Sequence, residues 1–156
     1  MFKGKKGLLF GLIGVGVLIA ILVVVLFFVF CGSDIEPGMS EVEFKEAMLD
    51  AGFKEDSVSG GYAGNVEGVG KVQVNYGFED EKLAMIILTS ENSDALESYL
   101  KERYEWERVP GNLFDFYMYD DGEVVGIMML GMTSFFFTEY VDADMLETVE
   151  MYRSMK

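Results

Sequence analysis

The chain has 156 residues, of which 51% are apolar, and its 27 acidic and 12 basic side chains give a formal net charge of −15. It contains one cysteine and no histidine, which excludes an intrachain disulfide and any histidine base or histidine metal ligand. A chain this negative does not attract nucleic acid through its overall field, and a chain this apolar is not typical of a disordered segment. The composition therefore indicates a folded, acidic protein.

The N-terminal part of the chain divides into two segments. Residues 1–6 carry three lysines and no acid, and the 24 residues from 7 to 30 contain no charged side chain. A helix of that length spans about 36 Å, which is enough to cross a hydrocarbon core of about 30 Å. The sequence therefore predicts a stub over residues 1–6 and a transmembrane helix, a signal anchor, over residues 7–30.

Charge predicts the orientation of this helix. Lysines at the start of a span favour the cytoplasmic side, and 27 acidic against nine basic side chains follow Phe30, a formal charge of −18. We therefore expect a cytoplasmic N-terminus, a linker over residues 31–39 and an extracytoplasmic domain over residues 40–156 at the cell membrane. Two alternatives for the N-terminal segment are a cleaved signal peptide and a lipoprotein acylated at Cys31, since Cys31-Gly32-Ser33-Asp34 resembles the start of a mature lipoprotein.

Helical periodicity predicts three helices in the outer domain. Ser40 and Glu43 have the spacing of a capping box, and Gly52 stands where a helix C-terminus is expected. Helices are predicted over residues 41–51, from near Ser93 to before residue 109, and from Asp142 or Asp144 onwards. The last helix has an apolar stripe formed by Leu146, Val149 and Tyr152.

Alternating apolar residues and turn residues predict the strands. The expected strands cover residues 71–78, 83–89, 112–119, 124–130 and 133–141. The glycine-rich residues 57–68 are predicted to form an irregular loop or a weak edge strand, and no internal repeat is visible in the sequence. The predicted fold class is α+β: a small antiparallel sheet packed with about three helices.

Two of these strands are apolar on both faces. In residues 124–130 both alternating sets are hydrophobic, and residues 135–137 are three phenylalanines. Antiparallel strands usually have one face on the core and one face exposed to solvent. The second apolar face of these strands must therefore be shielded from water by another part of the protein or by a partner. Either helices or the glycine-rich segment cover it, or it is a docking surface for a partner protein, a second copy or a lipid. The candidate surface residues are Ile127, Met129, Phe135, Phe136 and Phe137.

Three stretches resemble a loose group of small membrane-anchored or lipid-anchored extracytoplasmic proteins of Gram-positive bacteria. They are Ser40-Glu41-Val42-Glu43-Phe44, Asn112-Leu113-Phe114-Asp115-Phe116-Tyr117 and Asp120-Asp121-Gly122-Glu123-Val124-Val125. The resemblance covers most of the chain. It implies an N-terminal anchor and the α+β domain, and it brings no catalytic residues.

The sequence offers little catalytic chemistry. Cys31 has no histidine to activate it, so we expect no enzyme. Residues 120–123 and 142–144 are rich in carboxylates, but neither stretch has the spacing of a twelve-residue calcium loop. They are better explained as a hairpin turn and a helix N-cap, so no metal site and no cofactor are predicted.

The functional prediction is a single-pass membrane protein whose acidic extracytoplasmic domain is a binding or interaction module. Its expected partners are the membrane and either an envelope protein or a second copy of the chain, and not nucleic acid. The alternative is a calcium-dependent or carboxylate-based envelope enzyme.

Overall fold

A computed structural model describes residues 35–156 of the chain. The predicted stub, transmembrane helix and acylation site lie outside these residues. None of the helices in the described part is long and apolar enough to cross a membrane. Residues 35–39 contact the domain: Gly38 donates to the Leu83 carbonyl at 3.0 Å, Leu83 donates to the Met39 carbonyl at 2.8 Å, and Ile35 is buried.

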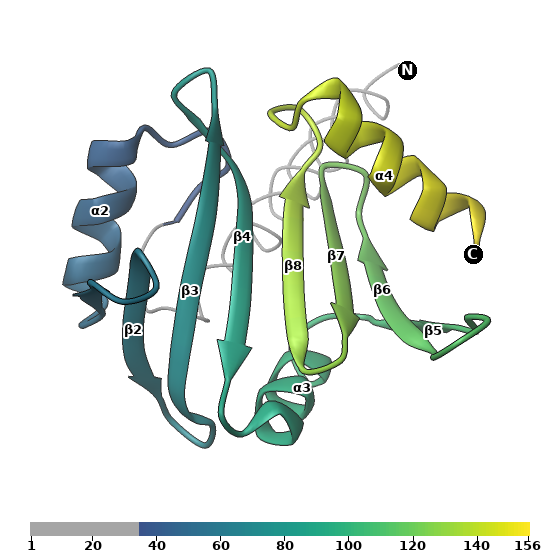
Figure 1. The fold of residues 1–156 in the computed structure, drawn as a ribbon, viewed down its shortest axis with the longest axis horizontal. Coiled ribbons are helices and arrows are strands. Elements are labelled where there is room, and N and C mark those ends of the chain that lie inside the picture. The colour runs from purple at the N-terminus through teal and green to yellow at the C-terminus, as the bar shows by residue number, and fades with distance from the viewer. Residues whose placement is uncertain (1–34) are drawn as a thin grey trace, which may run out of the picture.

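The described residues form an α+β fold with three helices, as predicted (Figure 1). The helices are α2 (Glu41–Asp50), α3 (Ser93–Lys101) and α4 (Ala143–Ser154). The capping box of α2 is present, with Ser40 and Glu43 satisfying each other's backbone N–H groups. Gly52 follows α2 with a φ of +83°, the left-handed conformation that ends a helix and favours glycine.

The eight strands within residues 35–156 belong to one antiparallel sheet, in the order β1-β2-β3-β4-β8-β7-β6-β5. The strands are β1 (Lys54–Asp56), β2 (Gly61–Val66), β3 (Gly70–Glu79), β4 (Lys82–Ser90), β5 (Glu107–Val109), β6 (Phe116–Asp120), β7 (Val124–Met129) and β8 (Met132–Phe137).

The strand order shows that one arrangement occurs twice. A helix followed by a four-stranded meander describes both α2 with β1 to β4 and α3 with β5 to β8, and the last strands of the two meanders pair in the centre. The β3–β4 and β7–β8 hairpins both close through two residues with positive φ, Asp80-Glu81 and Leu130-Gly131. Two successive residues with positive φ are typical of the tight hairpin turn whose twist matches that of the flanking strands. The domain therefore has two halves with the same topology, which the sequence did not reveal.

Two cores lie on opposite faces of the sheet. Phe135 and Phe137 belong to the larger core, beneath α2 and α3, whereas Phe136 belongs to the smaller one. Since successive side chains of a strand point to opposite faces, the two cores are separated by the sheet. Val149 of α4 is fully buried in the smaller core, so α4 covers the second face of the second half.

The structure corrects four details of the predicted elements. Residues 61–66 form a regular strand inside the sheet, because β1 pairs beyond them. α3 ends at Lys101, and β5 lies where the second helix was predicted to continue. β8 ends at Phe137, four residues earlier than expected. On α4, Leu146 is 37% exposed and Met145 packs on the smaller core in its place.

Candidate functional site

The structure places the five candidate surface residues inside or against the cores. Ile127, Phe135, Phe136 and Phe137 are between 1% and 8% exposed, and Met129 is partly buried against the smaller core. They do not form an exposed docking surface, because α4 covers one face of these strands and α3 the other. The apolar second face is therefore explained by a helical cover, which was one of the two interpretations of the sequence.

The carboxylates of the two acidic stretches are engaged in local backbone bonds. Asp121 accepts from the backbone of Glu123 at 3.0 Å and of Val124 at 2.7 Å, and Asp142 accepts from Met145 at 2.7 Å. These are the bonds of a turn and of a helix N-cap. Within residues 35–156, no three metal-ligating side chains come close enough together to hold an ion.

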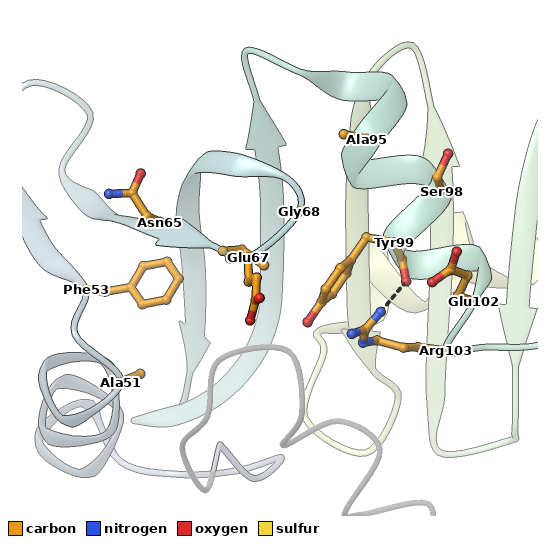
Figure 2. A pocket seen from close by; sticks show the side chains of 11 residues that line it. Ala51, Phe53, Asn65, Glu67, Gly68, Ala95, Ser98, Tyr99, Glu102 and Arg103 are labelled. Atoms are coloured by element: carbon orange, nitrogen blue, oxygen red, sulfur yellow. Dashed lines mark hydrogen bonds between the residues drawn. The ribbon is translucent and has the colours of Figure 1, made fainter.

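A hollow of about 760 Å³ lies beside α3, on the side of the sheet that carries the larger core, and we call it the α3 groove. It is bounded by α3, by the segment that follows α2, and by the turn between β2 and β3. Figure 2 shows Phe53 and Glu67 on one side of it and Tyr99 and Arg103 on the other. Its lining residues are Ala51, Phe53, Asn65, Val66, Glu67, Gly68, Ala95, Ser98, Tyr99, Glu102 and Arg103.

The end of α3 holds Arg103 in place. Its guanidinium carbon lies 3.3 Å from the centroid of the Tyr99 ring, and its Nη1 donates to the Tyr99 carbonyl at 3.0 Å. That carbonyl is in the last turn of α3, where backbone oxygens lack helical partners and a positive charge is favourable. The cation is therefore stacked, hydrogen-bonded and fixed at the wall of the groove.

One part of this guanidinium is unsatisfied. The Nε atom of Arg103 is buried and has no hydrogen-bond acceptor within the described residues. Leaving a buried donor without a partner costs about 1–3 kcal/mol. Such an atom at the wall of a hollow is a candidate for contact with a ligand.

The groove also carries negative charge. Glu67, in the β2–β3 turn, and Glu102, directly after α3, both line it and are exposed. Asn65 and Ser98 add neutral polar groups. The groove therefore combines one cation, two carboxylates and the aromatic rings of Phe53 and Tyr99.

A second hollow, of about 690 Å³, has the equivalent position in the other half. The segment after α3 and the β6–β7 turn bound it, as the segment after α2 and the β2–β3 turn bound the α3 groove. Arg103 lines both hollows. In the second one, Trp106 and Tyr119 lie with ring centroids 6.0 Å apart, and the Tyr119 hydroxyl donates to Asp121 at 2.8 Å. Burial, together with Asp121, raises the pKa of Tyr119 well above its ordinary value, so this phenol stays protonated.

No pattern in the sequence marks Arg103 as a site residue. One indication of its role was present, because the chain has three arginines and a rare cation in so acidic a chain is worth following. Which of the three arginines has no carboxylate partner depends on contacts between segments that are distant in the sequence, so the sequence alone does not show it.

No protein-family model, curated protein or solved structure matches the chain. The resemblance to small anchored proteins of Gram-positive bacteria stays a prediction.

Proposed function

We propose that the protein is a single-pass membrane protein whose extracytoplasmic domain binds a ligand or a partner and catalyses no reaction. The anchoring rests on the uncharged residues 7–30 and on Lys3, Lys5 and Lys6 before them. With this orientation, the acidic domain lies outside the cytoplasm.

The observation that carries the binding role is the α3 groove. Its volume falls within the range of about 300–1,000 Å³ that is typical of small-molecule sites. It is also lined by a fixed cation that has an unsatisfied N–H group. Catalysis would need a nucleophile with a base or a matched acid–base pair. Ser98, Glu67 and Glu102 line the groove, but no hydrogen bond joins any two of these side chains within residues 35–156. These residues favour recognition over reaction.

Topology is tested on the full chain in cells. We expect the protein to stay with the membrane after alkaline carbonate extraction, and we expect added protease to digest the domain in spheroplasts but not in inverted vesicles. A domain protected in spheroplasts would contradict the orientation. The variant Cys31→Ala separates the two forms of anchor. An intact mass that changes only by the substitution supports a transmembrane helix, whereas loss of the mass of acyl chains together with retention of residues 1–30 supports acylation.

The binding role is tested by cross-linking in intact envelopes followed by mass spectrometry. We expect specific cross-links to a second protein or a second copy from Lys71, which pairs in the sheet with the lining residue Asn65. A variant with Glu67→Lys should change their yield, whereas Glu147→Lys on the distant helix α4 should not. If no partner is cross-linked and no small molecule binds the purified full chain, the binding proposal is contradicted.

A further inference from the structure

The three arginines of the chain can be compared atom by atom, since all three lie in the described part. Arg153 uses Nε and Nη2 to hold the two carboxylate oxygens of Asp120, at 2.8 and 2.9 Å. Arg108 uses the same two atoms to hold Asp115. In both cases the edge formed by Nε and Nη2 binds a carboxylate, which is the paired geometry that guanidinium groups favour.

In Arg103 the same edge has no acceptor among the described residues. Its Nη1 is occupied by the Tyr99 carbonyl, while Nε has no partner and Nη2 forms no hydrogen bond within residues 35–156. The stacking on Tyr99 fixes the plane of the guanidinium. A receptor held in place before its ligand arrives loses less conformational freedom on binding. Arg103 is therefore held in place and lacks the carboxylate that the other two arginines hold.

The charges around this edge restrict the ligand. A simple anion in the groove would meet Glu67 and Glu102 as well as Arg103, within a domain that is strongly negative. A ligand that carries an ammonium group beside its carboxylate has no net charge and can interact with both signs. Figure 2 shows Glu67 across the groove from Arg103, with the Tyr99 side chain between them in this view.

We propose that Arg103 binds the carboxylate of a small zwitterion of the α-amino-acid type in the α3 groove, with Glu67 receiving its ammonium group. The proposal deepens the binding role proposed above and rests on it. Tyr99, Phe53 and Val66 provide an apolar wall for the rest of the ligand.

The arginine side chains themselves report on binding. The full chain is prepared in detergent micelles with ¹⁵N-labelled arginine, so that three Nε–H resonances appear, and the variants R103K, R108K and R153K assign them. We expect titration with L-phenylalanine to move the Arg103 resonance to a saturating position. The Arg108 and Arg153 resonances should stay in place, because their edges are occupied.

Two analogues separate the contributions of the charges. N-Acetyl-L-phenylalanine keeps the carboxylate without the ammonium, and L-phenylalaninamide keeps the ammonium without the carboxylate. We expect the free amino acid to bind best, the acetyl form roughly 10-fold or more weaker, and the amide not at all, since charge-assisted bonds of this kind change affinity by such factors. Equal binding of the amide would overturn the role of Arg103. Equal binding of the acetyl form would overturn that of Glu67, and saturation by inorganic phosphate alone would overturn the assignment of a carboxylate.

Matched variants complete the test. R103Q should abolish saturable binding of L-phenylalanine, whereas R108Q should leave this binding unchanged. Since R103Q also removes the bond to the Tyr99 carbonyl, E67Q provides a second measurement on an exposed residue. It should weaken binding of the free amino acid and should not weaken binding of the acetyl form, which has no ammonium group for Glu67 to receive. If the titrations fail while envelope cross-linking finds a partner, the Arg103 proposal falls and the binding role stands.

Discussion

At the scale of single residues, the ion pair between Asp120 and Arg153 joins β6 to α4. Only 18% of the Asp120 side chain and 24% of the Arg153 side chain are exposed. The two hydrogen bonds from Arg153 lower the pKa of the Asp120 carboxyl below its ordinary value, more than burial raises it. The ionised carboxylate therefore stabilises the folded state.

The lowered pKa of Asp120 makes the stability of the folded state depend on pH. Because the folded-state pKa is depressed, the stabilisation is complete above the unfolded-state pKa of about 3.9 and is lost as pH falls through the folded-state value. We expect Asp120→Asn to lower the free energy of unfolding by about 1.5–3 kcal/mol at pH 7. The difference from the natural chain should shrink in acid, as measured by urea unfolding in micelles at pH 7 and pH 3.

The pair of Asp115 with Arg108 provides the control. Both side chains are more exposed than those of the Asp120 pair, so solvent screens their attraction. Asp115→Asn should therefore lower the free energy of unfolding less than Asp120→Asn does. Equal losses for the two variants, or a loss for Asp120→Asn that does not change with pH, would show that the Asp120 pair does not act through its charge.

At the scale of elements, α4 is the cover of the smaller core. Its N-cap residue Asp142 accepts from the Met145 backbone at 2.7 Å, and Val149 is its fully buried side chain. Asp142→Ala should destabilise α4 by about 0.5–2 kcal/mol, because a first-turn N–H loses its acceptor. We expect the amide protons of α4 to exchange several-fold faster, while those of β3 and β4 are unchanged. Glu147→Ala, which removes the same charge from an exposed position in α4, should not have this effect.

The sequence predicts the three helices and the long strands, because their caps and apolar periodicity are local properties. It predicts β2 only as one of two alternatives, a weak edge strand or a loop, since Gly61 and Gly64 weaken a strand pattern. These glycines are explained only by packing: a Cβ atom at Gly64 would lie 2.7 Å from the Phe53 ring, and one at Gly61 would lie 2.3 Å from the Val74 carbonyl oxygen. The edge strands β1 and β5 have three residues each, too few for any periodicity.

The candidate site was hidden for a similar reason. The lining of the α3 groove comes from three segments that are distant in the chain, and neither Glu67 nor Phe53 has a pattern that links it to Arg103. The unsatisfied Nε of Arg103 is a property of the folded arrangement. Composition predicted the lack of histidine chemistry, but not the place where a ligand could bind.

At the scale of the whole molecule, the two halves share one core. Phe44 and Met48 come from the first half and Phe135 and Phe137 from the second, and all four are buried in the larger core. β4 and β8 also join the halves into one sheet, from Met85 paired with Phe136 to Thr89 paired with Met132. Neither half can therefore bury its apolar face alone, and we expect the described domain to unfold in a single cooperative transition.

One substitution in the first half tests this coupling through a probe in the second. Met48 is fully buried in α2, and its replacement by alanine should cost about 2–5 kcal/mol. Trp106, the only tryptophan, packs against Tyr119 and Phe135 in the second half. We expect Met48→Ala to lower the urea midpoint reported by Trp106 fluorescence as much as the midpoint reported by the amide resonance of Val74 in β3. The neighbouring variant Leu49→Ala, at a position that is 48% exposed, should leave both midpoints nearly unchanged. Two separate midpoints, with only that of Val74 lowered by Met48→Ala, would mean that the repeated halves fold independently.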